Sequence, residues 1–186
     1  MEPGKRNKAP DSRTLVLISG PVASGKTTAA GMLARAAREL GLQAASIDMD
    51  EMVEMIAGSD WSLITGEDRL RACHATSALV NQLHDSGVSF IAVAGSTLSQ
   101  YEWDEVLQPL NCRPNVFFVL LRVTLEEASR RIKRDPDRTM TKDPNYLAQL
   151  DARTNRQAIR EHDIELETDG TTADEVSARI AARVFG

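Results

Sequence analysis

The residues with the clearest chemical potential form one motif near the N-terminus, G-x-x-x-x-G-K-T over residues 20–27. Glycines let the backbone turn tightly, so that successive N–H groups point inward at an anion. A lysine at this spacing reaches the β- and γ-phosphates of a nucleotide, and the next hydroxyl binds the accompanying magnesium ion. We expect Thr27 to be a metal ligand and Lys26 to be catalytic. The expected nucleotide contacts are Gly20, Pro21, Val22, Ala23, Ser24, Gly25, Lys26, Thr27 and Thr28.

Two predicted elements flank this motif and would position it. Residues 14–18 are leucine or β-branched, which suits a strand buried on both faces of a parallel sheet. Residues 29–37 are rich in alanine and favour a helix, whose N-terminus adds a positive dipole end to the site. A strand before and a helix after the motif disfavour a chance match. The fate of the phosphate stays open, since GTPases, ATP motors and small kinases share this loop.

Two aspartates follow the second predicted strand, residues 44–47. Alternation at the strand end predicts that Asp48 and Asp50 lie on the same side. One would orient magnesium through water, which we assign to Asp48, and the other, Asp50, would accept a proton from an incoming hydroxyl. This arrangement favours a kinase. The alternative is that Asp50 only caps a helix beginning at Glu51.

The sequence lacks the motifs that are typical of other classes of nucleotide-binding protein. The GTPase patterns N-K-x-D and D-x-x-G do not follow any predicted strand, which disfavours guanine specificity. The third predicted strand ends in Gly95 and Ser96 without the carboxylate that is typical of motor ATPases. A formal net charge of -5 argues against a protein that holds nucleic acid by counterion release.

Strands alternate with helices along the rest of the chain, which predicts an α/β protein with a parallel sheet, helices on both faces, and ligands at the carboxyl ends of the strands. We expect a flexible tail over residues 1–13 and one domain over 14–186. The further expected strands are 88–94, 115–121 and 163–167, and the further expected helices are 51–57, 67–84, 99–110, 124–134, 145–161 and 173–184.

A basic loop follows the helix that we expect to end at Arg134. Residues 135–144 contain two prolines and no apolar periodicity, which predicts a surface loop. Arginine forks bind phosphate and a mobile loop closes over a site, so we expect a lid over about residues 134–145 with Arg138 as a catalytic phosphate contact. The alternative is that the basic residues of 130–138 form a solvated helix face with Glu126 and Glu127.

These features together resemble the small P-loop kinases: shikimate kinase, gluconate kinase, adenylylsulfate kinase and the chloramphenicol phosphotransferase group. The resemblance rests on the phosphate loop, the D-x-D after the second strand, the small residues ending the third, and the arginine-rich lid. It implies a three-layer P-loop NTPase fold, like that of nucleotide kinases, with five parallel strands in the order 2-3-1-4-5. It also implies ATP and Mg²⁺ as cofactors and transfer of the γ-phosphoryl group to a small acceptor.

The resemblance further implies roles for single residues. Asp50 would contact the acceptor hydroxyl, and Arg69, with Arg71 as the alternative, would hold an acidic group of the acceptor. The chain departs from shikimate kinase where Ser96 and Thr97 replace the second and third glycines of a run. The other implied contacts are Gly95, Ser96 and Arg156 on the acceptor side, Arg131, Gly170 and Thr171 around adenine, and Arg138 at the transferred phosphate.

Four apolar residues recur near helical spacing around the helix predicted after Asp50: Met49, Met52, Met55 and Ile56. We expect them to pack the helix against the sheet; if they instead face the acceptor, the acceptor is bulky and partly apolar.

No apolar run approaches membrane-spanning length, and residues 1–13 lack the hydrophobic centre of a signal peptide. We therefore expect a cytoplasmic protein with no membrane contact. We further expect it to be a monomer or a homodimer.

The sequence therefore predicts an ATP- and magnesium-dependent phosphotransferase acting on a hydroxyl of a small molecule, either a metabolite or an antibiotic. Two alternatives stay open. One is a kinase of a nucleic-acid or nucleotide 5′-hydroxyl, and the other is an ATPase or nucleotide-binding switch without an acceptor, in which Asp50 is only a helix cap.

Overall fold

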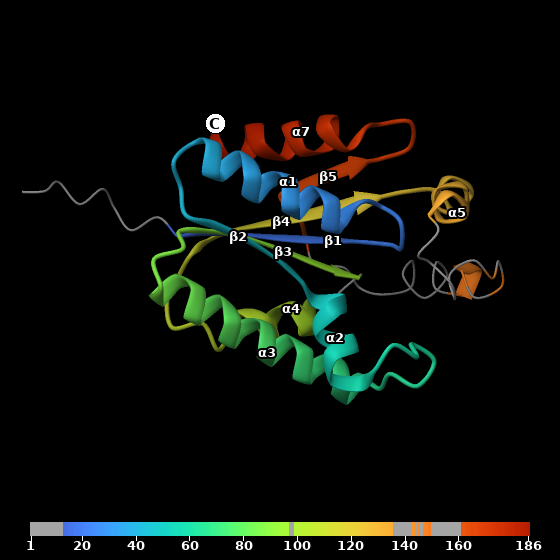
Figure 1. Ribbon diagram of the computed structural model, residues 1–186, viewed down its shortest axis with the longest axis horizontal. Coiled ribbons are helices and arrows are strands. Elements are labelled where there is room, and N and C mark those ends of the chain that lie inside the picture. Colours follow the sequence, from blue (N-terminus) through green and yellow to red (C-terminus); the bar gives the residue numbers. More distant parts are fainter. Residues whose placement is uncertain (1–12, 97–98, 136–142, 144, 146, 150–160) are drawn as a thin grey trace, which may run out of the picture.

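The computed structural model of the protein describes residues 13–96, 99–135, 143, 145, 147–149 and 161–186. Five parallel strands form one sheet in the order β2-β3-β1-β4-β5 (Figure 1). This confirms the predicted fold and strand order. The strands are β1 (Thr14–Gly20), β2 (Ala44–Asp48), β3 (Phe90–Ser96), β4 (Asn115–Arg122) and β5 (Ile164–Glu167).

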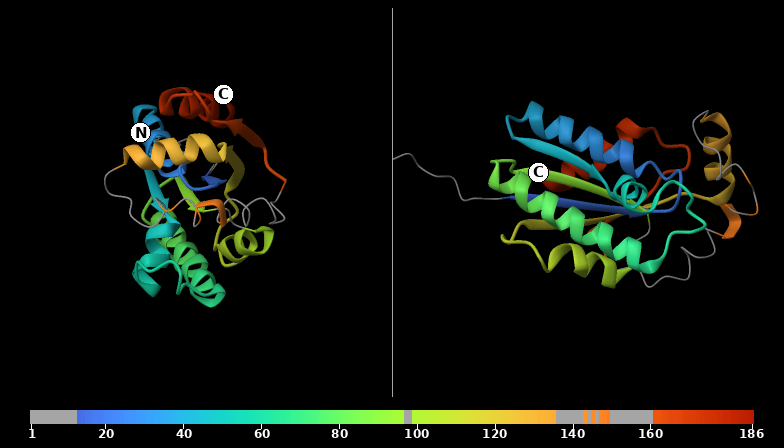
Figure 2. Two further views of the ribbon diagram at one scale, coloured as in Figure 1. Left: turned by 90° about the vertical axis from the view of Figure 1, so that its right-hand side faces the viewer. Right: turned by 60° about the horizontal axis from the view of Figure 1, so that its bottom comes forward.

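Helices cover both faces of the sheet. Helices α1 and α7 lie on one face and α3 and α4 on the other, while α5 crosses the end of the sheet toward which the strands point (Figures 1 and 2). The helices are α1 (Lys26–Glu39), α2 (Met49–Ala57), α3 (Gly66–Asp85), α4 (Gln100–Leu107), α5 (Leu125–Arg134) and α7 (Ala173–Phe185). Residues 145 and 147–149 are also helical; the rest of the helix predicted over 145–161 lies outside the described residues. In the described part of the chain no helix has the length and apolar character needed to cross a membrane.

The core is divided by the central strand β1. Successive side chains of a strand point to opposite faces, so Val16 and Ile18 pack under α1 and α7 while Leu15 and Leu17 pack under α3 and α4. All four are completely buried or nearly so. The leucine and β-branched composition of this strand therefore reflects burial on both faces, as its sequence predicts.

Of the boundaries that differ from the sequence-based expectations, the starts of α1 and α2 affect the site. Helix α1 begins at Lys26 rather than Ala29, so the phosphate motif runs directly into it. Strand β3 ends at Ser96, as expected, and Ser96 pairs with Gly20 at the end of β1. Helix α2 begins at Met49, so Asp50 lies in its first turn and the expected strand-type alternation with Asp48 is wrong.

Candidate active site

The phosphate motif forms a tight loop between β1 and α1. Gly25 has φ +94 and Ala23 has φ +61, both in the left-handed region, and Gly25 is the N-cap residue of α1. A Cβ on Gly20 would lie 2.4 Å from the carbonyl oxygen of Leu121 and 2.8 Å from Ser24 Oγ. Glycine is therefore required at position 20 because β4 passes directly against the loop.

The polar groups of this loop suit an anion. The Lys26 ammonium group donates a hydrogen bond of 3.0 Å to the carbonyl oxygen of Pro21, which brings its positive charge back over the loop. The Ser24 hydroxyl is buried and has no hydrogen-bond partner among the described residues. An orphaned buried hydroxyl beside a helix N-terminus and a lysine fits a bound phosphate group.

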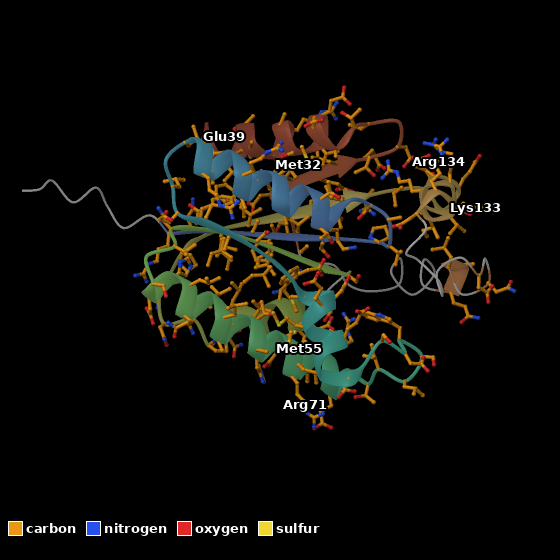
Figure 3. All side chains as sticks on the ribbon, viewed as in Figure 1. Met32, Glu39, Met55, Arg71, Lys133 and Arg134 are labelled. Atoms are coloured by element: carbon orange, nitrogen blue, oxygen red, sulfur yellow. The ribbon has the colours of Figure 1, made fainter. Side chains whose placement is uncertain are left out.

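A cavity of about 550 Å³ opens beside this loop. Three segments meet around it: the phosphate loop with the start of α1, the inner side of α5, and the connection from β5 to α7. Figure 3 shows Lys133 and Arg134 on α5, at the carboxyl end of the sheet. Among the lining residues are Ala23, Ser24, Gly25, Lys26, Thr27, Thr28, Arg130, Arg131, Arg134, Thr168, Gly170 and Thr171. The structure thus brings Arg131, Gly170 and Thr171 to the same cavity as the phosphate motif.

Arg131 joins the three segments. Its guanidinium donates to the carbonyl oxygens of Ala23, at 3.0 Å, and Thr168, at 2.5 Å. Its Nε donates to Glu127 at 2.8 Å, and Arg130 pairs with the same carboxylate. Hydrogen bonds from both arginines lower the pKa of Glu127 to about 2. Arg130 fits the alternative of a solvated helix face, because it is half exposed and bonds only to Glu127 among the described residues. Arg131 does not fit it, because it also bonds to Ala23 and Thr168.

On the other side of the loop, Asp48 has two partners. Thr27 Oγ1 donates to Asp48 Oδ2 at 2.6 Å, and the backbone N–H of Asp50 donates to Asp48 Oδ1 at 2.9 Å. Asp48 is thus the N-cap of α2, and the alternative in which Asp50 plays that part is wrong. The predicted metal ligands Thr27 and Asp48 are adjacent, and a hydroxyl with a carboxylate is an oxygen donor set that suits Mg²⁺.

Asp50 faces the end of β3. Its Oδ1 accepts the backbone N–H of Ser96 at 3.2 Å, and its Oδ2 accepts a short hydrogen bond from the Ser96 hydroxyl. Gly95, the other residue predicted at this place, is buried within β3 beside Ser19 of β1. The two aspartates of the D-x-D therefore face different groups, Asp48 the phosphate loop and Asp50 the end of β3.

Arg69 of α3 lies next to Ser96, and Arg71 does not. The Arg69 guanidinium donates to Glu102 Oε1 at 2.6 Å and to the carbonyl oxygen of Ser96 at 3.3 Å. Arg71 is half exposed and pairs with Glu67 and Asp68 of its own helix; Figure 3 shows it projecting away from the sheet. Of the two arginines considered from the sequence, Arg69 is therefore the one near Asp50.

Glu102 is a site residue that the sequence analysis missed. Its Oε2 completes the capping box of α4 with Ser99, which the S-x-x-E spacing predicts, while its other oxygen holds Arg69. Burial alone would raise the pKa of Glu102, but the charge and hydrogen bonds of Arg69 and the hydrogen bonds from Ser99 leave it below its ordinary value. The capping motif gave no sign of this second role, since that role depends on α3 packing beside α4.

A model of the shikimate kinase family matches residues 22–185. The chain belongs to the shikimate kinase family. The match includes most of the phosphate motif, both aspartates and the end of β3. The chain is therefore related to small-molecule kinases. A search of curated proteins finds no match.

Solved structures share the fold of this shikimate kinase family member. A sugar kinase from Janibacter sp., without ligand, has 23% identity over 92% of this chain and 93% of its own, with a TM-score of 0.65. The Mycobacterium tuberculosis APS kinase CysC, in complex with AMPPNP and APS, has 19% identity over 95% and 100%, with a TM-score of 0.66. A shikimate kinase from Acinetobacter baumannii, in complex with shikimate, has 20% identity over 94% and 93%, with a TM-score of 0.58.

Some predictions for this family member lie outside the described residues. They are Arg138, Arg156 and most of the lid expected over 134–145.

The methionines on α2 differ in burial: Met49 is buried in the core and Met52 packs against it, whereas Met55 is 77% exposed. The prediction that the apolar side chains pack the helix is right for Met49 and Met52 and wrong for Met55 and for Ile56, which is 40% exposed.

Proposed function

We propose that the protein is an ATP- and magnesium-dependent phosphotransferase that moves the γ-phosphoryl group to a hydroxyl of a small molecule. One observation carries the proposal: the β2–α2 junction presents one carboxylate to the phosphate loop and another to the end of β3. Asp48 contacts Thr27, and Asp50 contacts Ser96 beside Arg69. Asp48 thus faces the nucleotide site, and Asp50, two residues later, faces a second site that contains Arg69.

In this proposal each group has a defined task. The loop amides and Lys26 bind the phosphates, and Thr27 with Asp48 hold the metal. When bound, Mg²⁺ would neutralise charge that develops on the phosphate oxygens. Asp50 accepts the proton of the acceptor hydroxyl, and Arg69 orients an acidic group of the acceptor through the N–H groups that its present partners leave available.

The remaining sequence-based assignments belong to the same proposal. Arg131, Gly170 and Thr171 contact the nucleotide from the far side of the cavity, whose lining they form. Arg138 contacts the transferred phosphate and Arg156 contacts the acceptor, the roles that the family resemblance implies. Support comes from the family match, and from relatives of the same fold described with AMPPNP and APS and with shikimate.

The test is an acceptor screen based on ADP release. Shikimate, gluconate and a panel of hydroxylated metabolites and antibiotics are added to the protein with ATP and Mg²⁺, and we expect at least one to raise ADP release above the basal rate. Lys26→Ala should abolish ADP release and weaken ATP binding. Asp50→Asn should lower the acceptor-stimulated rate by about 10²–10⁴-fold, because it removes a general base, while calorimetry shows unchanged ATP binding.

Two results would contradict the proposal. If no acceptor raises ADP release, the protein is an ATPase or nucleotide-binding switch rather than a kinase of these compounds. If Asp50→Asn keeps the full stimulated rate, Asp50 is not the base.

A further inference from the structure

The Asp50 carboxylate is held on both oxygens by one residue. Ser96 donates its backbone N–H to Oδ1 at 3.2 Å and its hydroxyl to Oδ2. Hydrogen bonds to an ionised carboxylate are stronger than those between neutral groups. Two such donors from a single residue fix the plane of the carboxylate as well as its position.

Without these donors, Asp50 has a competing orientation. It is the second residue of α2 after the cap Asp48, a place from which a carboxylate can turn toward the N–H groups of its own first turn. Those groups have no partner within the helix and attract negative charge. The Ser96 hydroxyl holds the carboxylate at the end of β3 instead.

Ser96 is itself held in place. It is the last residue of β3 and pairs with Gly20 of β1, which begins the phosphate loop. Its carbonyl oxygen accepts from Arg69 Nη2 at 3.3 Å, and Arg69 Nε is bound to Glu102 at 2.6 Å. The side chains of Arg69 and Glu102 are only 15% and 11% exposed, so water competes weakly for this ion pair.

A continuous series of contacts therefore connects α4, α3, β3 and α2. It runs from Glu102 to Arg69, from Arg69 to the Ser96 carbonyl, and from the Ser96 amide and hydroxyl to Asp50.

We propose that Ser96 is the positioning residue of the base, holding the Asp50 carboxylate toward the acceptor, with Arg69 and Glu102 fixing Ser96 in turn. The inference rests on the proposed function of Asp50. A carboxylate oxygen has room for two donors, so Asp50 Oδ2 accepts the Ser96 hydroxyl and the acceptor hydroxyl together. The acceptor proton passes to Asp50, and Ser96 keeps its own proton.

The test uses Ser96→Ala, which removes the hydroxyl, and Ser96→Thr, which keeps one. Rates are measured with the compound that gives the fastest ADP release in the acceptor screen, and crystal structures are determined for both variants. We expect Ser96→Ala to lower kcat roughly ten- to hundredfold, the effect of losing a hydrogen bond to a charged group, with the KM for ATP unchanged. Ser96→Thr should restore most of kcat, which a loss of folding stability alone would not explain.

Ser89→Ala is the matched control. Ser89 is also half-buried and directly precedes β3, but at the opposite end from Ser96. Within the described part of the chain its hydroxyl donates to the carbonyl oxygen of Gln43 alone. We expect wild-type kcat for this variant. In the crystal structure of Ser96→Ala, the Asp50 carboxylate should turn from β3 toward the first turn of α2.

The outcomes separate this inference from the proposed function. If Asp50→Asn is inactive while Ser96→Ala has the wild-type kcat, the role of Ser96 is overturned and the kinase proposal stands. An Asp50 side chain that keeps its orientation in Ser96→Ala overturns it equally. If no compound in the screen stimulates ADP release, the proposed function fails, and the crystal structures alone decide whether Ser96 orients Asp50.

Discussion

The hydroxyl of Thr27 donates a hydrogen bond of 2.6 Å to Asp48 Oδ2, which joins the first turn of α1 to the end of β2. The other oxygen of the same carboxylate caps α2 by accepting the backbone N–H of Asp50. One aspartate thus serves the predicted metal site with one oxygen and the local folding of α2 with the other.

These two roles of Asp48 are separable by substitution. Asn is as good an N-cap as Asp, so Asp48→Asn should keep the thermal stability of the protein while it loses the charge that faces the metal. We expect a raised magnesium requirement and a strongly reduced rate of ADP release, measured by titrating Mg²⁺. Asp48→Ala should in addition lose about 1 kcal/mol of unfolding free energy, since the cap is gone. Equal stability of the Asn and Ala variants would contradict the capping role.

The phosphate loop depends on glycine at position 20. Gly20→Ala places a methyl group 2.4 Å from the backbone oxygen of Leu121, which cannot move without β4. We expect a loss of about 1–3 kcal/mol in unfolding free energy, together with weaker ATP binding by calorimetry. Gly31→Ala is the control, because nothing lies within 4 Å of its added methyl group on α1; it should gain about 0.5–1 kcal/mol, as Ala is the better helix former. A Gly20→Ala protein of wild-type stability would show that the loop is not tightly packed.

Arg69 and Arg71 offer a matched pair on one helix. Both changes to Ala remove one positive charge from α3, but only Arg69 contacts Ser96 and Glu102. We expect Arg69→Ala to raise the KM for the acceptor and lower kcat by at least tenfold, and Arg71→Ala to leave both within about twofold of wild type. Steady-state kinetics with the best acceptor from the screen decides this. Similar losses in both variants would point to a general effect of charge.

Arg131 should matter for nucleotide binding through its shape. Lys keeps the charge but lacks the planar fork that reaches the carbonyl oxygens of Ala23 and Thr168 together. We expect Arg131→Lys to weaken ATP binding by about tenfold, the effect of one to two lost hydrogen bonds, measured by calorimetry. Arg130→Lys is the comparison, because its described hydrogen bonds end on Glu127; it should change the affinity much less.

Glu102 should make the fold sensitive to acid. Its pKa in the folded protein lies below the ordinary value of 4.5, so its ionised form stabilises the fold above that pH and this stabilisation is lost as the pH falls through the lowered pKa. Glu102→Gln should therefore show a smaller difference in unfolding free energy between neutral pH and pH 3 than the wild type, measured by urea denaturation. Glu67→Gln, which changes an exposed side chain, is the control. An unchanged difference in Glu102→Gln would contradict this account.

Local sequence was enough for the sheet and for the phosphate loop. A doubly buried strand needs a continuous apolar run, and a phosphate loop needs glycines and a lysine at fixed spacing, so both leave marks within a few adjacent residues. The capping box of Ser99 and Glu102 is equally local, because its S-x-x-E spacing lies within four residues. The boundaries of helices and strands were harder to predict. Helix α2 begins at Met49, where strand alternation was expected, because the Asp48 side chain caps the helix there.

The sequence by itself determined the strand order that its family implies, the phosphate motif, and the candidate carboxylates Asp48 and Asp50. Only the tertiary structure decided that Asp48 faces Thr27, that Asp50 is held by Ser96, and that Arg69 rather than Arg71 lies beside them. The physical reason is distance along the chain. The contact between Asp50 and Ser96 spans 46 residues, and that between Arg69 and Glu102 spans 33, so both depend on how α2, α3 and α4 pack against one face of the sheet.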